Sequence, residues 1–141
     1  MEFLLFLTDD AKAILESIQR ANVSVQEDAI PCWQHLKLFG GLQREKRRLI
    51  SFTANIRRSG KDVKKYVNQT LLHEAVHVVQ LCKNNKPLGY NIRNMHLTPI
   101  KNQFLENSTK FSGSTKKERE AYWLEDKPRR IKSLLRKYCD T

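Results

Sequence analysis

The sequence predicts an α+β fold, mostly helical, with a short β-sheet. Three observations lead to this prediction. Apolar residues recur at helical spacing in several segments that follow polar cap residues. One β-branched and aromatic segment, about 48–56, has the composition of a strand and precedes the longest helical pattern. The length of 141 residues suits one core, so we expect a single domain over 1–141.

The first half of the chain contains a helix, a reversal and the strand. Residues 8–23 predict a first helix of about fourteen residues, because polar caps at Thr8 and Asp9 precede apolar residues at helical spacing. Pro31 and the Gly40–Gly41 pair then predict a break and a chain reversal. The predicted strand over 48–56 follows, and we expect it to form an edge of the sheet.

The second half is helical. A long helix is expected from about Lys61 to Cys82, ended by the turn-forming residues of 84–89. A short helix over 99–106 and a polar loop over 107–115 follow. A helix capped by Ser114 or Thr115 comes next, and Pro128 begins a further one.

Composition places the chain among soluble proteins. Hydrophobic residues make up 40% and charged residues 29% of the sequence. The apolar start "MEFLLFL" is too short for a signal peptide and contains Glu2. No apolar run approaches the roughly 18 residues that a membrane span needs. We expect a cytoplasmic monomer that does not enter a membrane.

The net charge of +11 indicates an affinity for anionic partners such as nucleic acid, acidic proteins or lipid headgroups. The cations occur in scattered clusters, among them "REKRR" at 44–48 and "KPRRIKSLLRK" at 127–137. No nucleic-acid-binding motif and no aromatic interleaving accompany them in the sequence. A solubilising basic surface is therefore favoured over a nucleic-acid site.

Three widely separated cysteines, Cys32, Cys82 and Cys139, argue against a disulfide framework. Their odd number and the absence of a CxxC pair favour free thiols in a reducing compartment. Cys32 and His35 have the spacing of half a zinc knuckle, but the sequence has no second half.

The segment "TLLHEAVHVVQLC", residues 70–82, contains the candidate metal ligands and the candidate catalytic base. His73 and His77 are four residues apart and therefore share one face of a helix, with Glu74 one step around. Two neutral imidazoles can hold Zn²⁺, and the adjacent carboxylate can act as general base. The alternative is an internally bonded His-Glu-His cluster. It is disfavoured because the apolar flanks would bury polar groups that then need partners.

A catalytic zinc site needs a third protein ligand. His96 is one candidate, and the segment "KEREAYWLED" offers carboxylates. Helical register favours Glu118 on the side of Ala121, while Glu120 shares a side with Trp123 and looks more exposed. A capping box of Thr115 and Glu118 competes with ligation. The remaining candidates are Glu120, His96, Glu125 and Asp126.

"HEAVHVVQ" followed by "EREAYWLED" resembles the gluzincin zinc metallopeptidases, in which HExxH lies on one helix and an ExxA glutamate on a later one. The resemblance covers these two segments. It implies a small zincin-like domain in which Glu118 is the third ligand, through its spacing to Ala121. Many members place an aspartate after the alanine to bond a ligating histidine. This chain has Tyr122 there, and Tyr122 or Glu125 would take over that role.

These patterns predict a zinc-dependent metalloprotease that hydrolyses peptide bonds in an intracellular protein or peptide, with Glu74 as general base. The family further implies that the edge strand beside the metal pairs with the substrate. Tyr90, His96 and Tyr122 are candidates for stabilising the oxyanion. One alternative is a basic nucleic-acid- or protein-binding module with a structural or vestigial zinc site. Another is a DNA-recruited protease of the Spartan-like class, whose third ligand is usually a histidine, which would be His96.

Overall fold

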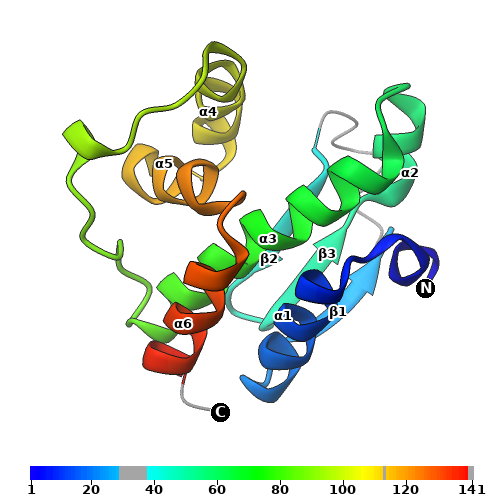
Figure 1. Ribbon diagram of the computed structural model, residues 1–141, viewed down its shortest axis with the longest axis horizontal. Helices are drawn as coiled ribbons and strands as arrows, with labels where there is room; N and C mark the ends of the chain where they lie inside the picture. Colours follow the sequence, from blue (N-terminus) through cyan, green and yellow to red (C-terminus); the bar gives the residue numbers. More distant parts are fainter. Residues whose placement is uncertain (29–37, 113, 140–141) are drawn as a thin grey trace.

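A computed structural model of the chain describes residues 1–28, 38–112 and 114–139. The fold is mostly helical with one three-stranded sheet, which confirms the predicted α+β class. Figure 1 shows α3 crossing the middle of the molecule between the sheet and helices α4 to α6. In chain order the elements are η1 (Glu2–Phe6), α1 (Asp9–Arg20), β1 (Ser24–Glu27), β2 (Gly40–Gln43), β3 (Arg48–Ser51), α2 (Thr53–Arg58), α3 (Val63–Cys82), η3 (Ile92–Asn94), α4 (Pro99–Ser112), α5 (Thr115–Leu124) and α6 (Pro128–Cys139).

The sheet has the order β1-β3-β2, with β1 parallel and β2 antiparallel to β3. The prediction of an edge strand over 48–56 is therefore wrong in two respects. The strand ends at Ser51 and lies in the centre of the sheet, and Thr53 already begins α2. The apolar residues of 48–56 serve two elements, because Leu49 fills the core from β3 and Ile56 fills it from α2. The edge nearest to α3 is β2.

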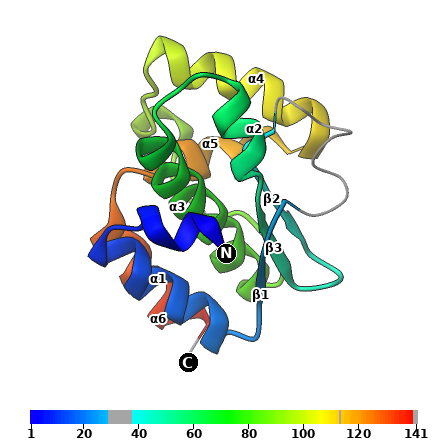
Figure 2. The ribbon, with the colours of Figure 1, turned by 90° about the vertical axis from the view of Figure 1, so that its right-hand side faces the viewer.

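Helix α1 follows its sequence pattern. Thr8 caps it by accepting a hydrogen bond from the backbone N–H of Ala11 at 3.2 Å. Its buried face, Ala11, Ile14, Leu15 and Ile18, joins the main core as expected. Figure 2 shows α1 beside α6, on the other side of α3 from β2 and β3.

Helix α3 is the central element, and its bounds confirm the predicted helix over 61–82. Asp62 caps it through the backbone N–H of Lys65. Every residue from Thr70 to Gln80 is buried, since α1, α5, α6 and the sheet surround this stretch. The polar side chains within it must therefore find partners inside the protein.

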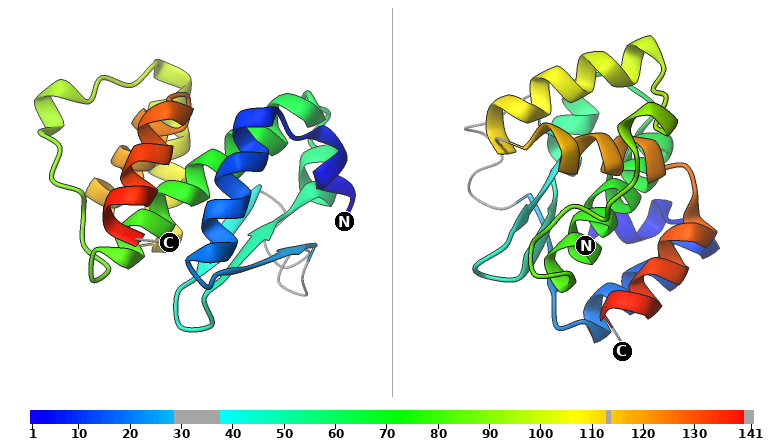
Figure 3. Two further views of the ribbon diagram at one scale, coloured as in Figure 1. Left: turned by 60° about the horizontal axis from the view of Figure 1, so that its bottom comes forward. Right: turned by 90° about the vertical axis from the view of Figure 1, so that its left-hand side faces the viewer.

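The C-terminal helices follow the sequence pattern except in the length of α4. Helix α4 continues to Ser112, so the loop predicted over 107–115 is largely helical. Ser114 caps α5 by accepting a hydrogen bond from the backbone N–H of Lys117 at 3.4 Å. The connection from α3 to α4 runs along the side of the molecule away from the sheet (Figure 3). Among the described residues, no helix is long and apolar enough to cross a membrane.

A disulfide joins Cys82 at the end of α3 to Cys139 at the end of α6, with the two Cα atoms 5.2 Å apart. The expectation of free thiols is wrong for this pair. The disulfide could not be predicted from the sequence, because the two cysteines are 57 residues apart and only the packing of α6 along α3 brings the helix ends together. Disulfides are typical of oxidising compartments. Cys32 and His35 lie outside the described residues.

Candidate metal centre

His73 and His77 lie one turn apart on α3, and both are buried. Their ring centroids are 5.1 Å apart. Glu74 lies between them in sequence and is also buried, and one potential ligand atom from each of the three residues falls within 4.8 Å of the others. The helical spacing read from the sequence thus places three potential metal-binding groups in one cluster.

Glu118 reaches this cluster from α5. Its carboxylate oxygens lie 2.5 Å from His77 Nε2 and 3.5 Å from His73 Nε2. Ala121 has no exposed surface in the interface and allows α5 to approach α3 closely. The Glu118 side chain therefore faces the histidines, and the hydrogen bond that caps the helix belongs to Ser114. The structure brings Glu118 to the place that register and resemblance predicted for it.

Electrostatics favour an ionised Glu118 and a protonated His73. Burial acts to raise the pKa of Glu118, but His77 and His73 outweigh it and hold the pKa well below its usual range. Burial acts to lower the pKa of His73, but Glu118, Glu125 and Glu74 outweigh it and raise the pKa to about 9. This corner of the protein therefore attracts positive charge.

Glu120 has a different environment from the one its register predicted. It is fully buried, so the expectation of exposure is wrong. Its carboxylate accepts hydrogen bonds from the backbone N–H groups of Leu88 at 2.8 Å and Gly89 at 2.9 Å, and from Gln80 Nε2 at 3.0 Å. Glu120 thus anchors the loop after α3. His96, the other candidate ligand, is exposed between η3 and α4.

Gln80 orients His77, a role that the sequence interpretation missed. Gln80 Nε2 donates to Glu120 Oε1 and to the backbone oxygen of Lys117, each at 3.0 Å. The amide therefore turns its oxygen toward His77 Nδ1, 2.8 Å away, which makes Nδ1 the donor. Nε2 of His77 is left facing Glu118. The sequence signal for this role was a glutamine three residues after a candidate ligand, within an otherwise apolar helical segment.

Glu125 and Tyr122 contact His73 from α5 and its C-terminal end. Glu125 Oε1 lies 4.0 Å from His73 Nδ1, is buried, and has no hydrogen-bond partner. Burial raises the pKa of Glu125. The Tyr122 ring packs on His73 with the centroids 4.4 Å apart, and its hydroxyl bonds to Ser108 and to the backbone oxygen of Phe104, both on α4. Glu125 is thus placed to accept a hydrogen bond from His73 after a small turn of the imidazole.

Glu74 occupies a tight space between α3 and β2. A Cβ atom added at Gly40 of β2 would meet Thr70 Cγ2 at 2.4 Å and Glu74 Cγ at 3.4 Å. The glycine therefore allows the edge strand to approach the helix beside Glu74. Burial raises the pKa of Glu74, although both histidines act to lower it. The carboxylate is therefore a stronger base than an exposed glutamate.

The donor set fits a zinc ion. Two imidazole nitrogens and one carboxylate converge from two packed helices, which is a ligand set of catalytic zinc sites. The nitrogen of each histidine that faces away from Glu118 has a polar group near it, Gln80 for His77 and Glu125 for His73. The Glu125 oxygen accepts no hydrogen bond from the described residues and lies 4.0 Å from His73 Nδ1 and 3.9 Å from Lys101 Nζ, so a small rotation of the His73 ring would complete a bond to it. The His73-Glu74-His77 cluster can thus hold a metal ion.

Comparison with known proteins identifies a family without assigning an activity. No curated protein and no solved structure matches the chain. One family model, described as a domain of unknown function, matches residues 3–140 and therefore nearly the whole chain. The chain belongs to this family, DUF8637.

Proposed function

We propose that this protein is a zinc-dependent metallopeptidase of the gluzincin type. The observation that carries the proposal is the position of the Glu118 carboxylate, which contacts Nε2 of both His73 and His77 while Glu74 belongs to the same buried cluster. His73, His77 and Glu118 would hold the ion, and Glu74 would be the general base. A purely structural site does not need a fourth, basic side chain at this position.

In the proposed mechanism, the zinc ion and the side chains of the protein have separate roles. A bound zinc ion supplies a Lewis acid for the scissile carbonyl and a source of hydroxide at neutral pH. The Glu74 carboxylate takes the proton of the attacking water and passes it to the leaving amine. Its raised pKa favours the first transfer, since a stronger base takes the proton of the water more readily. Gln80 keeps His77 in the tautomer that presents Nε2.

The neighbouring strand favours an extended peptide as substrate. Within the described sheet, β2 pairs with β3 on one side only. Gly40 brings this strand against α3 beside Glu74. A peptide added to the β2 edge would place a backbone carbonyl near the candidate metal ligands. The exposed fractions of His73 and Glu74, 8% and 6%, favour a flexible segment over a folded surface.

The alternatives read from the sequence have less support. A Spartan-like site would need His96 as third ligand, but His96 is exposed and does not belong to the cluster found among the described residues. A vestigial or purely structural site does not need the buried Glu74 beside the histidines, and it gains nothing from the Gln80 amide that orients His77.

The test is hydrolysis of an unfolded protein by the zinc-loaded chain. We expect cleavage by the wild type, loss of cleavage with retained zinc in Glu74→Gln, and unchanged cleavage in Glu16→Gln, a matched change at an exposed position of α1. Equal activity of Glu74→Gln and wild type would remove Glu74 from the mechanism. A wild type that binds zinc and cleaves no unfolded protein or peptide would overturn the proposal and favour the structural site.

A further inference from the structure

A strip of alternating cations and aromatic rings runs from α5 to the end of α6, outside the metal centre. We define this strip as Lys83, Trp123, Lys127, Arg130, Lys137 and Tyr138. We propose that it binds single-stranded nucleic acid, with bases stacking on its rings and phosphates pairing with its cations. The proposal does not depend on the metal or on peptidase activity.

Each aromatic ring of the strip is flanked by two cations. Lys127 Nζ lies 4.6 Å and Arg130 Cζ 5.5 Å from the centroid of Trp123. Lys137 Nζ lies 5.1 Å and Lys83 Nζ 5.5 Å from the centroid of Tyr138. Both rings are partly buried, so each is fixed by the core and still reaches the surface. The aromatic interleaving that the linear sequence lacks is created by the fold.

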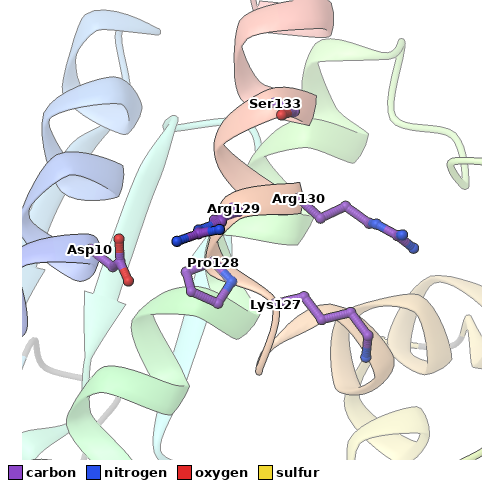
Figure 4. A pocket seen from close by; sticks show the side chains of 6 residues that line it. All are labelled: Asp10, Lys127, Pro128, Arg129, Arg130 and Ser133. Atoms are coloured by element: carbon purple, nitrogen blue, oxygen red, sulfur yellow. The ribbon is translucent and has the colours of Figure 1, made fainter.

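The positively charged side chains of α6 lie on two sides of the helix, which we call its flanks. The helix carries five cations and no carboxylate. Successive residues of a helix lie 100° apart, so the buried face of α6, Ile131 and Leu135, has charged residues on both sides of it. The side that belongs to the strip carries Arg130 and Lys137. The other side carries Arg129, Lys132 and Arg136. Figure 4 shows Lys127 and Arg130 extending away from Asp10, and Arg129 on the Asp10 side.

Each flank pairs one cation with a carboxylate, so the aromatic rings, and not the amount of unpaired charge, distinguish the strip from the other flank. Lys132 pairs with Asp10 at 2.6 Å on the α1 side. On the strip, Asp126 contacts Lys127 at 3.0 Å, and no carboxylate contact is found for Arg130 or Lys137 among the described residues. The strip thus keeps net positive charge beside flat apolar rings. This combination suits a single strand, whose bases are unstacked and available, better than an acidic peptide, which offers no rings.

Stacking can replace the cation–ring contacts. An exposed cation–π contact contributes roughly 2- to 5-fold to an equilibrium constant, whereas a base stacked on an aromatic side chain contributes roughly 5- to 150-fold. A base that displaces one of the two cations at a ring therefore gains more from stacking than the ring loses. Lys83 and Lys127 also donate to backbone oxygens of Leu88 and Trp123, so pairing with the neighbouring phosphates falls mainly to Arg130 and Lys137.

The first test uses the fluorescence of Trp123. The chain has two tryptophans, so Trp33→Phe leaves Trp123 as the reporter. We expect an oligothymidylate to quench this fluorescence and to bind more tightly than a duplex of equal length. Unchanged fluorescence at saturating oligonucleotide, or a preference for the duplex, would overturn the proposal.

The second test separates the strip from general basicity. Single-strand affinity falls with salt at a slope of about 0.7 per neutralised phosphate, so Arg130→Gln with Lys137→Gln should lower the slope by about 1.4. The matched pair Arg129→Gln with Arg136→Gln removes the same charge from the other flank and should change the slope by less than half as much. Tyr138→Leu should weaken binding roughly 5-fold or more with the slope unchanged.

Three further outcomes would contradict the proposal. Equal slope changes for the two charge-matched pairs would indicate a diffuse basic surface. Binding to vesicles of anionic lipid that requires Arg130 and Lys137, without binding to the oligonucleotide, would assign the strip to a membrane surface. If Tyr138→Leu is folded by circular dichroism and binds the oligonucleotide with the wild-type affinity, bases do not stack on Tyr138.

Discussion

Replacing Gln80 with methionine tests the proposal that Gln80 orients His77 to bind a metal ion. The change keeps the length of the side chain and removes both polar atoms. His77 Nδ1 loses its acceptor at 2.8 Å, and Glu120 loses one of its donors at 3.0 Å. Losing the partner of a ligating histidine typically weakens metal binding 10- to 100-fold, or about 1.4–2.8 kcal/mol. The buried N–H left without a partner costs roughly 1–3 kcal/mol of folding free energy.

The two effects of Gln80→Met are measured separately. A zinc competition titration against a chelating dye gives the affinity, and urea unfolding of the metal-free protein gives the stability. Gln19→Met, the same change at an exposed position of α1, serves as control and should alter neither. Unchanged zinc affinity together with reduced stability would show that Gln80 only fills the core. It would thereby refute the tautomer argument.

Three further predictions concern the metal-free protein. Its free energy of unfolding should fall by roughly 3 kcal/mol as pH rises from 6.5 through about 9, because the folded pKa of His73 lies above its unfolded value. This fall should be smaller in Glu118→Gln. An equal fall in the wild type and in Glu118→Gln would contradict the pairing of His73 with Glu118. Gly40→Ala should cost about 1–3 kcal/mol, since its Cβ meets an α3 methyl group at 2.4 Å, whereas Gly41→Ala, with nothing within 4 Å, should be near neutral in the same urea assay. Cys82→Ser should lower stability by roughly 4 kcal/mol through loss of the disulfide, measured without reductant, and an identical unfolding midpoint would exclude the bond.

Local spacing was sufficient to predict the helix that carries the candidate metal-binding residues. His73, Glu74 and His77 depend only on the geometry of α3, which its apolar pattern and the Asp62 cap specify. Glu118 required one further step, the register of α5 against Ala121. That step placed Glu118 beside the histidines because a small residue marks where two helices approach closely, and its ligation of a metal stays a prediction.

The remaining features depend on contacts between distant segments. Gln80 and Glu120 acquire their roles only where α3, α5 and the loop at 88–90 meet, and register alone left Glu120 on an exposed side. The run at 48–56 was assigned to one strand because β-branched residues suit both a central strand and a short buried helix. The cation and aromatic strip likewise forms only when α6 folds back along α3.

Zinc titration of the purified chain and of Glu118→Gln tests the central claim most directly. We expect the wild type to bind about one equivalent at neutral pH, and Glu118→Gln to bind at least about 100-fold more weakly, since an amide replaces the one carboxylate that contacts both histidines. Glu120→Gln, the matched change two residues away, should lose far less affinity because its carboxylate binds backbone N–H groups. A wild type that takes up no zinc, or a Glu118→Gln variant that binds it as tightly, would contradict the account.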